Sequence, residues 1–204
     1  MKPLLLAPVV RILLATTILF ALVSCQRTVF QNPPSAAEAC DPALVGRWLS
    51  QGDKDEAEGE LEALVDAKCR LVTIEHKQTG ERRSEPTTLS TARVGGVRYL
   101  WLDAAWTNRS FEVEPNLLDR DGDIYLFAYS LSRNRLRLAN APNRALAHRV
   151  LDKDIMGEVL MRENELTVRI SGTPEEIRKT LGKHRVFRFD EPLQFRRAAS
   201  DDAP

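Results

Sequence analysis

Short apolar runs separated by turn signals fill the middle of the chain, and this pattern restricts the fold more than any other feature. Leu89 to Val94 and Val97 to Leu102 flank Gly95-Gly96, two residues that can both adopt positive φ. Two-residue turns of this kind join the strands of β-hairpins. Comparable runs occur about eight times without an internal repeat. The sequence therefore predicts a mainly β fold, an antiparallel sheet that closes to remove its edges.

The clearest strand runs from Asp123 to Ser132, and it is apolar on both faces. Such a strand either lines a ligand cavity or is covered by a helix, and the sequence is compatible with both. Two short helices are predicted, one over 142–151 and one that ends at Gly182. The second begins at Thr173-Pro174-Glu175-Glu176, a capping box with proline at the first helical position. Residues 103–122 are predicted to form a loop.

The first 24 residues have the composition of an export signal. Lys2 and Arg11 accompany an uncharged apolar run from Ile12 to Val23, which is shorter than the roughly 20 residues of a spanning helix. The alternative is a retained N-terminal membrane anchor that tolerates Arg11. Leu22-Val23-Ser24-Cys25 resembles a bacterial lipobox. The resemblance implies cleavage of residues 1–24 and acylation of Cys25, and two or more acyl chains hold a protein stably on a membrane.

This resemblance also implies a place in the bacterial cell envelope. Gln26 stands where aspartate would direct retention at the inner membrane, so we expect the outer membrane, facing the periplasm. Residues 25–39, which include Pro33-Pro34, are then the lipid anchor and a flexible tether. The domain spans 40–197, and 198–204 is predicted to be a disordered tail.

Two cysteines remain beside Cys25. In the periplasm, Cys40 and Cys69 are predicted to form a structural disulfide, the alternative being two free thiols. A metal site at these residues is not predicted, because no CxxC motif and no histidine lies near either cysteine.

The charge of the chain argues against nucleic acid as a partner and leaves calcium binding by an acidic segment as an alternative. Without residues 1–24 the chain has 27 Lys and Arg against 29 Asp and Glu, so it lacks the basic excess that nucleic-acid binding needs. The acidic segment 51–66 is either a solvated surface or a calcium site, and its apolar residues fit a helix or a strand equally. Asp119 to Asp123 begins like a calcium loop, but Ile124 and Ser130 occupy the EF-hand glycine and glutamate positions. No metal or cofactor is predicted.

Gly46-Arg47-Trp48 in the first strand and Arg196-Arg197 after the last are similar to the lipocalin (calycin) pattern. The middle of the chain also resembles a group of bacterial lipocalin-like lipoproteins of uncharacterised function. The resemblance covers most of residues 44–197. It implies an eight-stranded antiparallel barrel with one or two short helices, closed at one end by Gly46, Trp48 and either Arg196 or Arg197. A guanidinium over an indole ring is a favourable cation–π contact.

Three functions follow from these features. The first is a non-catalytic binding module that holds a small apolar ligand or lipid near the membrane, since a small barrel has room for one ligand at most. The second is an adaptor or structural lipoprotein that docks on other envelope proteins. The third, an enzyme, lacks support, because the sequence contains no GxSxG, HExxH or P-loop motif. His76, His148 and His184 fall on three separate predicted elements, so no catalytic residue is predicted.

Overall fold

The computed structural model describes residues 25–51, 60–77, 79–114, 116–162, 165–184 and 186–198. The predicted signal segment, residues 52–59 of the acidic segment and residues 199–204 of the predicted tail lie outside these ranges. The mainly β class is confirmed: the described residues form thirteen strands, three α-helices and one short 3-10 helix.

The elements follow the chain in the order β1 (Cys25–Phe30), η1 (Pro42–Leu44), β2 (Gly46–Ser50), β3 (Glu60–Val65), β4 (Arg70–Lys77), β5 (Gly80–Arg83), β6 (Thr87–Thr88), β7 (Ser90–Val94), β8 (Val97–Asp103), α2 (Ala104–Ser110), β9 (Ile124–Ser132), β10 (Arg135–Ala139), α3 (Asn143–Leu151), β11 (Gly157–Arg162), β12 (Glu165–Ile170), α4 (Pro174–His184) and β13 (Leu193–Arg197).

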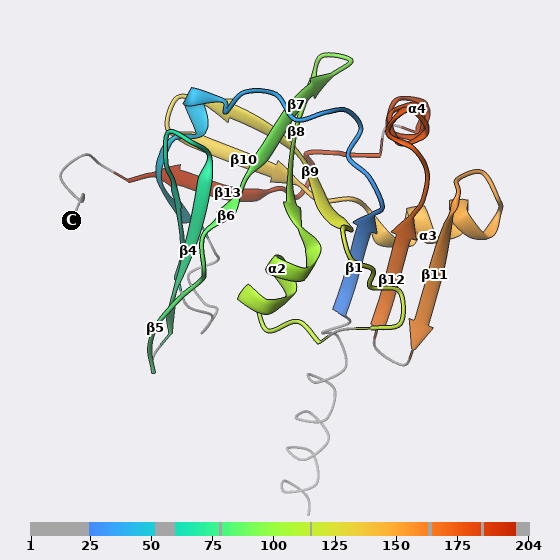
Figure 1. The fold of residues 1–204 in the computed structure, drawn as a ribbon, viewed down its shortest axis with the longest axis horizontal. Helices are drawn as coiled ribbons and strands as arrows, with labels where there is room; N and C mark the ends of the chain where they lie inside the picture. The colour runs from blue at the N-terminus through green and yellow to red at the C-terminus, as the bar shows by residue number, and fades with distance from the viewer. Residues whose placement is uncertain are drawn as a thin grey trace, which may run out of the picture.

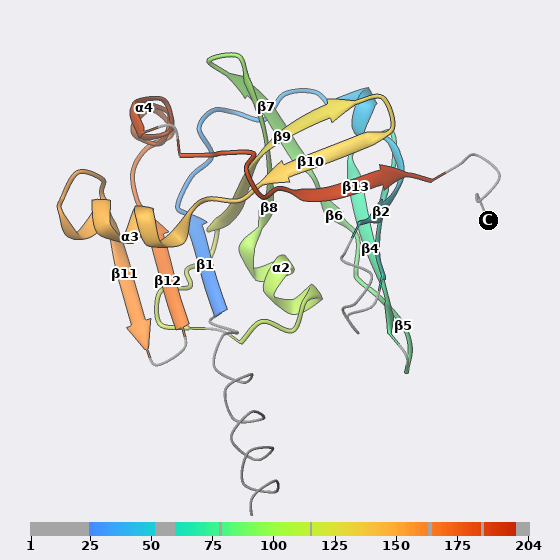
Figure 2. The same cartoon turned by 180° about the vertical axis from the view of Figure 1, so that it is seen from behind.

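All thirteen strands belong to one mixed sheet (Figure 1). Its main path is β11-β12-β1-β9-β10-β13-β2-β3-β4-β5, and β8 pairs with β9 while β7 pairs with β8. β1 runs parallel to β12, whereas the other ladders are antiparallel. Figure 2 shows β11, β12 and β1 as one group beside α3, and the strands from β10 to β5 as a second group.

The predicted closed eight-stranded barrel is wrong. An antiparallel series runs from β7 through β8, β9, β10, β13, β2 and β3 to β4, and it fails to close at the outer edge of β4. There β5 pairs with Ile74–Lys77, and of the four remaining residues of β4 only Arg70 and Leu71 pair with the two-residue β6. On its other side the sheet continues from β9 to β1, β12 and β11. A hairpin on one edge and three added strands on the other therefore leave the sheet open.

The predicted flexible tether is wrong for its first six residues. Cys25–Phe30 form β1, which lies between β12 and β9, and Val29 and Phe30 are 1% and 0% exposed. Its six residues pair in register with Glu165–Ile170, about 140 positions later in the chain. Parallel pairing over such a separation leaves no local pattern in the sequence.

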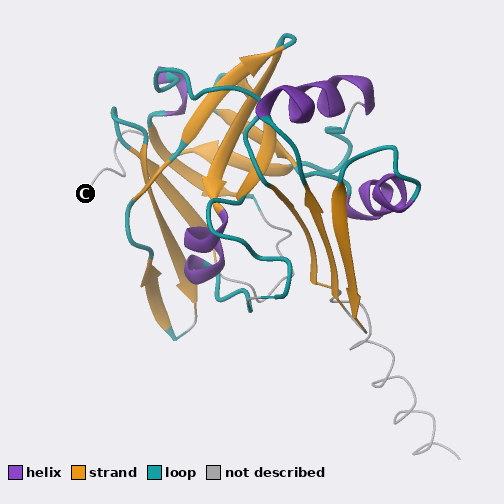
Figure 3. Cartoon of the chain, turned by 45° about the vertical axis from the view of Figure 1, so that its right-hand side comes forward, coloured by secondary structure: helices purple, strands orange, loops and turns teal. Residues whose placement is uncertain are grey.

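Both apolar faces of β9 are covered by side chains, because the strand separates two cores. Ile124 and Leu126 belong to a core beneath α3 and α4 that also contains residues of β1, β8 and β12. Phe127 and Tyr129 belong to or border a second core, which contains Trp48 of β2 and residues of β3, β4, β13 and α2. Figure 3 shows the helices placed on different sides of the strands.

Most local predictions agree with the structure. Gly95 and Gly96 have φ of 58° and 81° in the β7–β8 turn, and the helix predicted over 142–151 is α3. The capping box is present, since Glu176 N donates to Thr173 Oγ1 and Thr173 N donates to Glu176 Oε2, although α4 continues two residues beyond Gly182. The acidic Glu60–Val65 is a strand.

The loop predicted over 103–122 is wrong in its first half. Ala104–Ser110 form α2, and the carboxylate of Asp103 caps this helix by accepting a hydrogen bond from Trp106 N at 2.6 Å. Trp106 is 5% exposed and belongs to the second core. Tertiary burial of this tryptophan thus stabilises a helix too short to persist alone.

Candidate functional site

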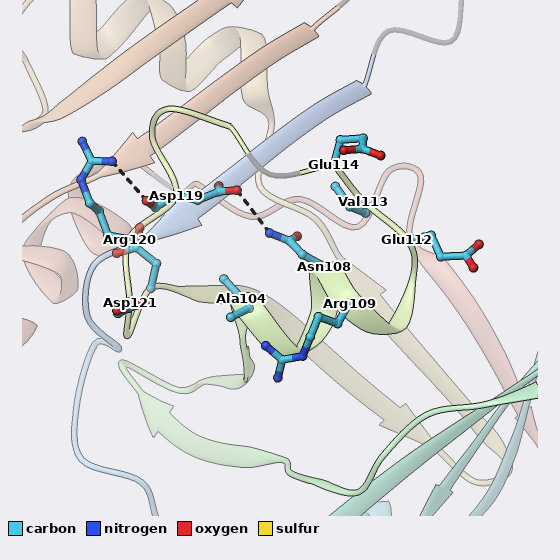
Figure 4. A pocket seen from close by; sticks show the side chains of 11 residues that line it. Ala104, Asn108, Arg109, Glu112, Val113, Glu114, Asp119, Arg120 and Asp121 are labelled. Atoms are coloured by element: carbon cyan, nitrogen blue, oxygen red, sulfur yellow. Dashed lines mark hydrogen bonds between the residues drawn. The ribbon is translucent and has the colours of Figure 1, made fainter.

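A surface cavity of about 410 Å³ lies between α2 and the segment that leads to β9. We call it the α2 cavity. Its lining combines five carboxylates with two arginines and a few small or apolar residues: Ala104, Ala105, Asn108, Arg109, Glu112, Val113, Glu114, Asp119, Arg120, Asp121 and Asp123. Figure 4 shows Asn108 of α2 and Asp119 pointing toward each other across it. Charged side chains therefore surround the cavity, although carbon atoms make up most of its exposed wall.

The segment after α2 is held to the sheet by Asn116. Its side-chain nitrogen donates to Glu165 Oε1 at 2.7 Å and to Thr167 Oγ1 at 2.8 Å, both on β12. Its side-chain oxygen accepts from Leu118 N, and its backbone nitrogen donates to Asp119 Oδ2. One asparagine thus fixes both the turn at 116–119 and its position over β12.

Arg27 of β1 lies beneath this segment and is 8% exposed. It donates to Glu165 Oε1 and to the Glu114 carbonyl, each at 3.0 Å, and one of its nitrogens is 3.7 Å from Asp119 Oδ2. Burial disfavours its charge, but hydrogen bonding and attraction from Tyr125, Asp119 and Glu165 outweigh burial and raise its pKa. Arg27 therefore stays charged and joins β1, β12 and the rim of the α2 cavity.

A second buried ion pair, between Arg169 and Asp123, lies on the same face of the sheet as Arg27. Arg169 of β12 makes two hydrogen bonds to the carboxylate of Asp123, at 2.7 and 2.9 Å, across the intervening β1. Asp123 is 2% exposed and Arg169 is 11% exposed. The hydrogen bonds and charge of Asp123 raise the pKa of Arg169. Arg27 and Arg169 both project from the sheet face opposite the apolar core beneath α3 and α4.

The carboxylate of Glu165 provides a pH test of this network. A hydrogen bond from Asn116 lowers its pKa, and hydrogen bonds from Arg27 and Thr167 add to the effect. A depressed folded-state pKa stabilises the fold above the unfolded value, about 4.3, and this contribution is lost as the pH falls through the folded pKa.

We expect Glu165→Gln to lower the free energy of unfolding by about 1–2 kcal/mol at pH 7, with less effect as the pH falls below about 4. Urea denaturation from pH 7 to pH 2.5 measures this. Glu191→Gln, at an exposed position, is the control. An equal loss of unfolding free energy in Glu165→Gln at pH 7 and at pH 2.5 would contradict a lowered pKa of Glu165 in the folded protein.

Trp48 and Arg197 meet as the sequence predicted, although they close no barrel. Trp48 is 1% exposed, and the Arg197 guanidinium lies 4.3 Å from its ring centroid. The ring nitrogen of Trp48 donates to the Leu44 carbonyl at 2.7 Å, and Arg197 donates to the carbonyls of Ala43 and Val45. Arg197 thus covers the ring and binds the backbone before β2.

The other two residues of this motif, Gly46 and Arg196, differ in their roles. Gly46 has φ of 132°, and a Cβ at this position would lie 2.5 Å from Nη1 of Arg197. Glycine is therefore required for the arginine to reach the tryptophan. Arg196 is exposed and pairs with Leu49 in the β13–β2 ladder, so it takes no part in covering Trp48.

The structure contains the predicted Cys40–Cys69 disulfide, with 5.4 Å between the two Cα atoms. It joins the segment before η1 to the start of β4. We expect Cys40→Ser/Cys69→Ser to lower the free energy of unfolding by about 2–4 kcal/mol, because the open chain gains conformational entropy. Urea denaturation of both proteins without reductant measures the loss. Two titratable thiols in the denatured, unreduced domain of a Cys25→Ala chain would contradict the bond.

The other sequence candidates are not brought together. His76 of β4 lies 3.1 Å from Glu81, His148 lies on α3, and His184 of α4 lies 2.6 Å from Arg149. Burial, followed by the charge of Arg149, lowers the pKa of His184. Within the described ranges, no cluster of three or more acidic, histidine or cysteine side chains is suited to a metal ion. The calcium alternative for residues 52–59 lies outside those ranges.

Sequence reasoning missed the polar layer around Arg27, Asn116 and Glu165. Arg27 and Thr28 resembled tether residues, and Asn116 stood in a predicted loop. The missed signal is the alternation along β12, where Glu165, Thr167 and Arg169 mark a polar face opposite an apolar one. β1 shows no such alternation, since Val29 shares a face with Arg27.

No described helix has the length and apolar content needed to span a bilayer. Comparison of the chain with models of protein families, with curated protein sequences and with solved structures gave no match.

Proposed function

We propose that the protein is a lipid-anchored lipoprotein of the bacterial envelope that works as an adaptor, docking on other envelope proteins. The anchor is supported by the lipobox-like Leu22-Val23-Ser24-Cys25 and the short apolar run before it. Localisation at the outer membrane, facing the periplasm, is part of the proposal and rests on Gln26 after the cysteine.

The packing of β9 carries the choice of an adaptor. This strand was the reason to expect an apolar ligand cavity, and its two apolar faces are instead buried in two cores that are filled by side chains. The lining of the α2 cavity shares no residue with either core, so this surface cavity is not the interior that β9 was expected to line. A small apolar ligand or lipid therefore stands as the second candidate function.

The adaptor is tested by native mass spectrometry of the full chain, extracted from its own membranes in mild detergent. The proposal predicts a stoichiometric complex with an envelope protein, which should become rarer when Cys25→Ala releases the chain from the membrane. An added mass of small-molecule size would favour the ligand-binding alternative. A chain recovered free of any partner would contradict both.

The anchor has its own test. Cys25→Ala should leave an uncleaved precursor without acyl chains, because processing requires the modified thiol in lipobox-type signals. Intact-mass measurement of the natural chain and the variant checks this, with Cys40→Ser/Cys69→Ser as a variant that should be processed normally. Normal cleavage of Cys25→Ala would contradict lipidation.

A further inference from the structure

No spacer separates the membrane-directed segment from the folded domain. The uncharged run Ile12–Val23 is followed within two residues by Cys25, whose backbone already pairs with Glu165 in the β1–β12 ladder. Residues 27–30 are buried in the sheet. A chain that enters a bilayer just before Cys25 therefore has almost no slack, and the Cys25 end of the domain must lie at the membrane surface.

The same end of the sheet includes the ends of two further strands. Glu165 is paired with Cys25 on one side and with Arg162, the last residue of β11, on the other. Figures 1 and 2 show the start of β1, the start of β12 and the end of β11 side by side at one edge of the molecule. A membrane at this edge would meet all three strands end-on.

Two large apolar side chains are exposed at this edge. Met161 of β11 is 72% exposed, and it lies on the rung that contains Gln26. Leu117 is 66% exposed and follows Asn116, which is bonded to Glu165. Met161 shares the sheet face of the apolar core, whereas Leu117 lies on the polar side with Arg27. They therefore flank the anchor point on opposite sides of the sheet.

We infer that the domain stands on the bilayer in one orientation, with β1, β12 and β11 end-on to the surface and Leu117 and Met161 inserted in the lipid interface. This inference rests on the membrane anchor of the proposed function and is independent of the adaptor role. It holds equally for an acylated Cys25 and for a retained apolar anchor, because both place the bilayer directly before β1. The orientation directs α4 and the β7–β8 turn away from the membrane, toward other envelope proteins (Figure 1).

The chain supplies a matched control at the other end of the same strand. Met156 is 62% exposed and immediately precedes Gly157, the first residue of β11. Met161 lies five positions further along the chain, a distance of roughly 17 Å along an extended strand. Met156 and Met161 are thus similar in type and exposure, and they differ in their distance from Cys25.

The test uses the full chain in vesicles of phosphatidylethanolamine and phosphatidylglycerol whose acyl chains carry bromine near the headgroup. Flotation first establishes that each protein is attached. Bromine quenches tryptophan at short range, and the natural Trp48, Trp101 and Trp106 are at most 7% exposed within the domain. In Met161→Trp and Leu117→Trp, we expect brominated lipid to remove roughly half of the added emission, as for residues 5–10 Å inside the interface. In Met156→Trp it should remove none.

A second experiment lengthens the connection between the membrane anchor and the domain. A flexible Gly-Ser insert of twelve residues after Cys25 keeps the lipobox-like segment and allows the domain to move roughly 20 Å away. Quenching in Met161→Trp should then fall to the level of Met156→Trp. Equal quenching at both ends of β11, no quenching at Leu117→Trp or Met161→Trp, or no effect of the insert would overturn the inference while the anchor stands. A chain that fails to float would overturn the anchor itself.

Discussion

Replacement of Trp48 by alanine should lower the free energy of unfolding by about 3–5 kcal/mol, the usual cost of removing a buried tryptophan. The side chain is 1% exposed and belongs to the core that joins β2, β4, β8 and β13. Its loss also leaves the Leu44 carbonyl without the indole donor, and it leaves Arg197 above a cavity. No neighbouring side chain of the filled core can occupy a volume of this size without moving others.

Urea denaturation of the Cys25→Ala domain with and without the substitution measures this effect. Arg197→Met provides a matched comparison, since it removes the cation–π contact and two hydrogen bonds while it keeps part of the cover over the ring. We expect it to cost about 1–3 kcal/mol, less than the loss of Trp48. A Trp48→Ala variant within 1 kcal/mol of the parent would show that this end of the fold contributes little to stability.

Arg169→Met should cost a further large amount, about 3–5 kcal/mol at neutral pH, because it leaves a buried carboxylate without its ion-pair partner. Asp123 is 2% exposed, and both of its carboxylate oxygens accept hydrogen bonds from Arg169. The methionine side chain fills a similar volume, so the loss reports on charge more than on packing. Because the ion pair joins residues on either side of β1, we expect its removal to weaken the packing of β12, β1 and β9 against one another.

A double-mutant cycle separates charge from packing. Asp123→Asn in the Arg169→Met background removes the unpaired charge and should recover most of the lost stability. Lys179→Met on the exposed face of α4 is the control, since Lys179 is 72% exposed and should change stability by less than about 0.5 kcal/mol. If Asp123→Asn fails to recover stability, the buried charge is not the cause of the loss.

Local features were predictable wherever a few neighbouring residues decide the conformation. Gly95-Gly96 allowed the hairpin because both residues have positive φ, and Thr173 to Glu176 contained both partners of a capping box. The Gly46, Trp48 and Arg197 contact was also predictable, although its full reason, the lack of room for a Cβ beside Arg197, appears only in three dimensions. The same pattern led to the wrong prediction of a closed barrel. The contact requires only that β2 and β13 be adjacent, and it does not determine whether the opposite edge of the sheet closes.

The candidate site was mostly beyond the sequence. The α2 cavity depends on a short helix that forms because Trp106 finds a core to enter, and on Asn116 binding two residues of β12. Arg27 could not be placed, since its partners come from residues 114–119 and from Glu165. Each of these contacts joins segments that are far apart in the chain.

The sequence by itself determined the β class, the β7–β8 hairpin, the starts of α3 and α4 and the pairing of two cysteines, because turn chemistry, capping and cysteine number act locally or leave few choices. Only the tertiary structure decided that Cys25–Phe30 is an inner strand, that the sheet stays open at β4, and that β9 divides two cores. The physical reason is that strand pairing is a backbone interaction available to any extended segment. Which segments pair is settled by the burial of side chains contributed from the whole chain.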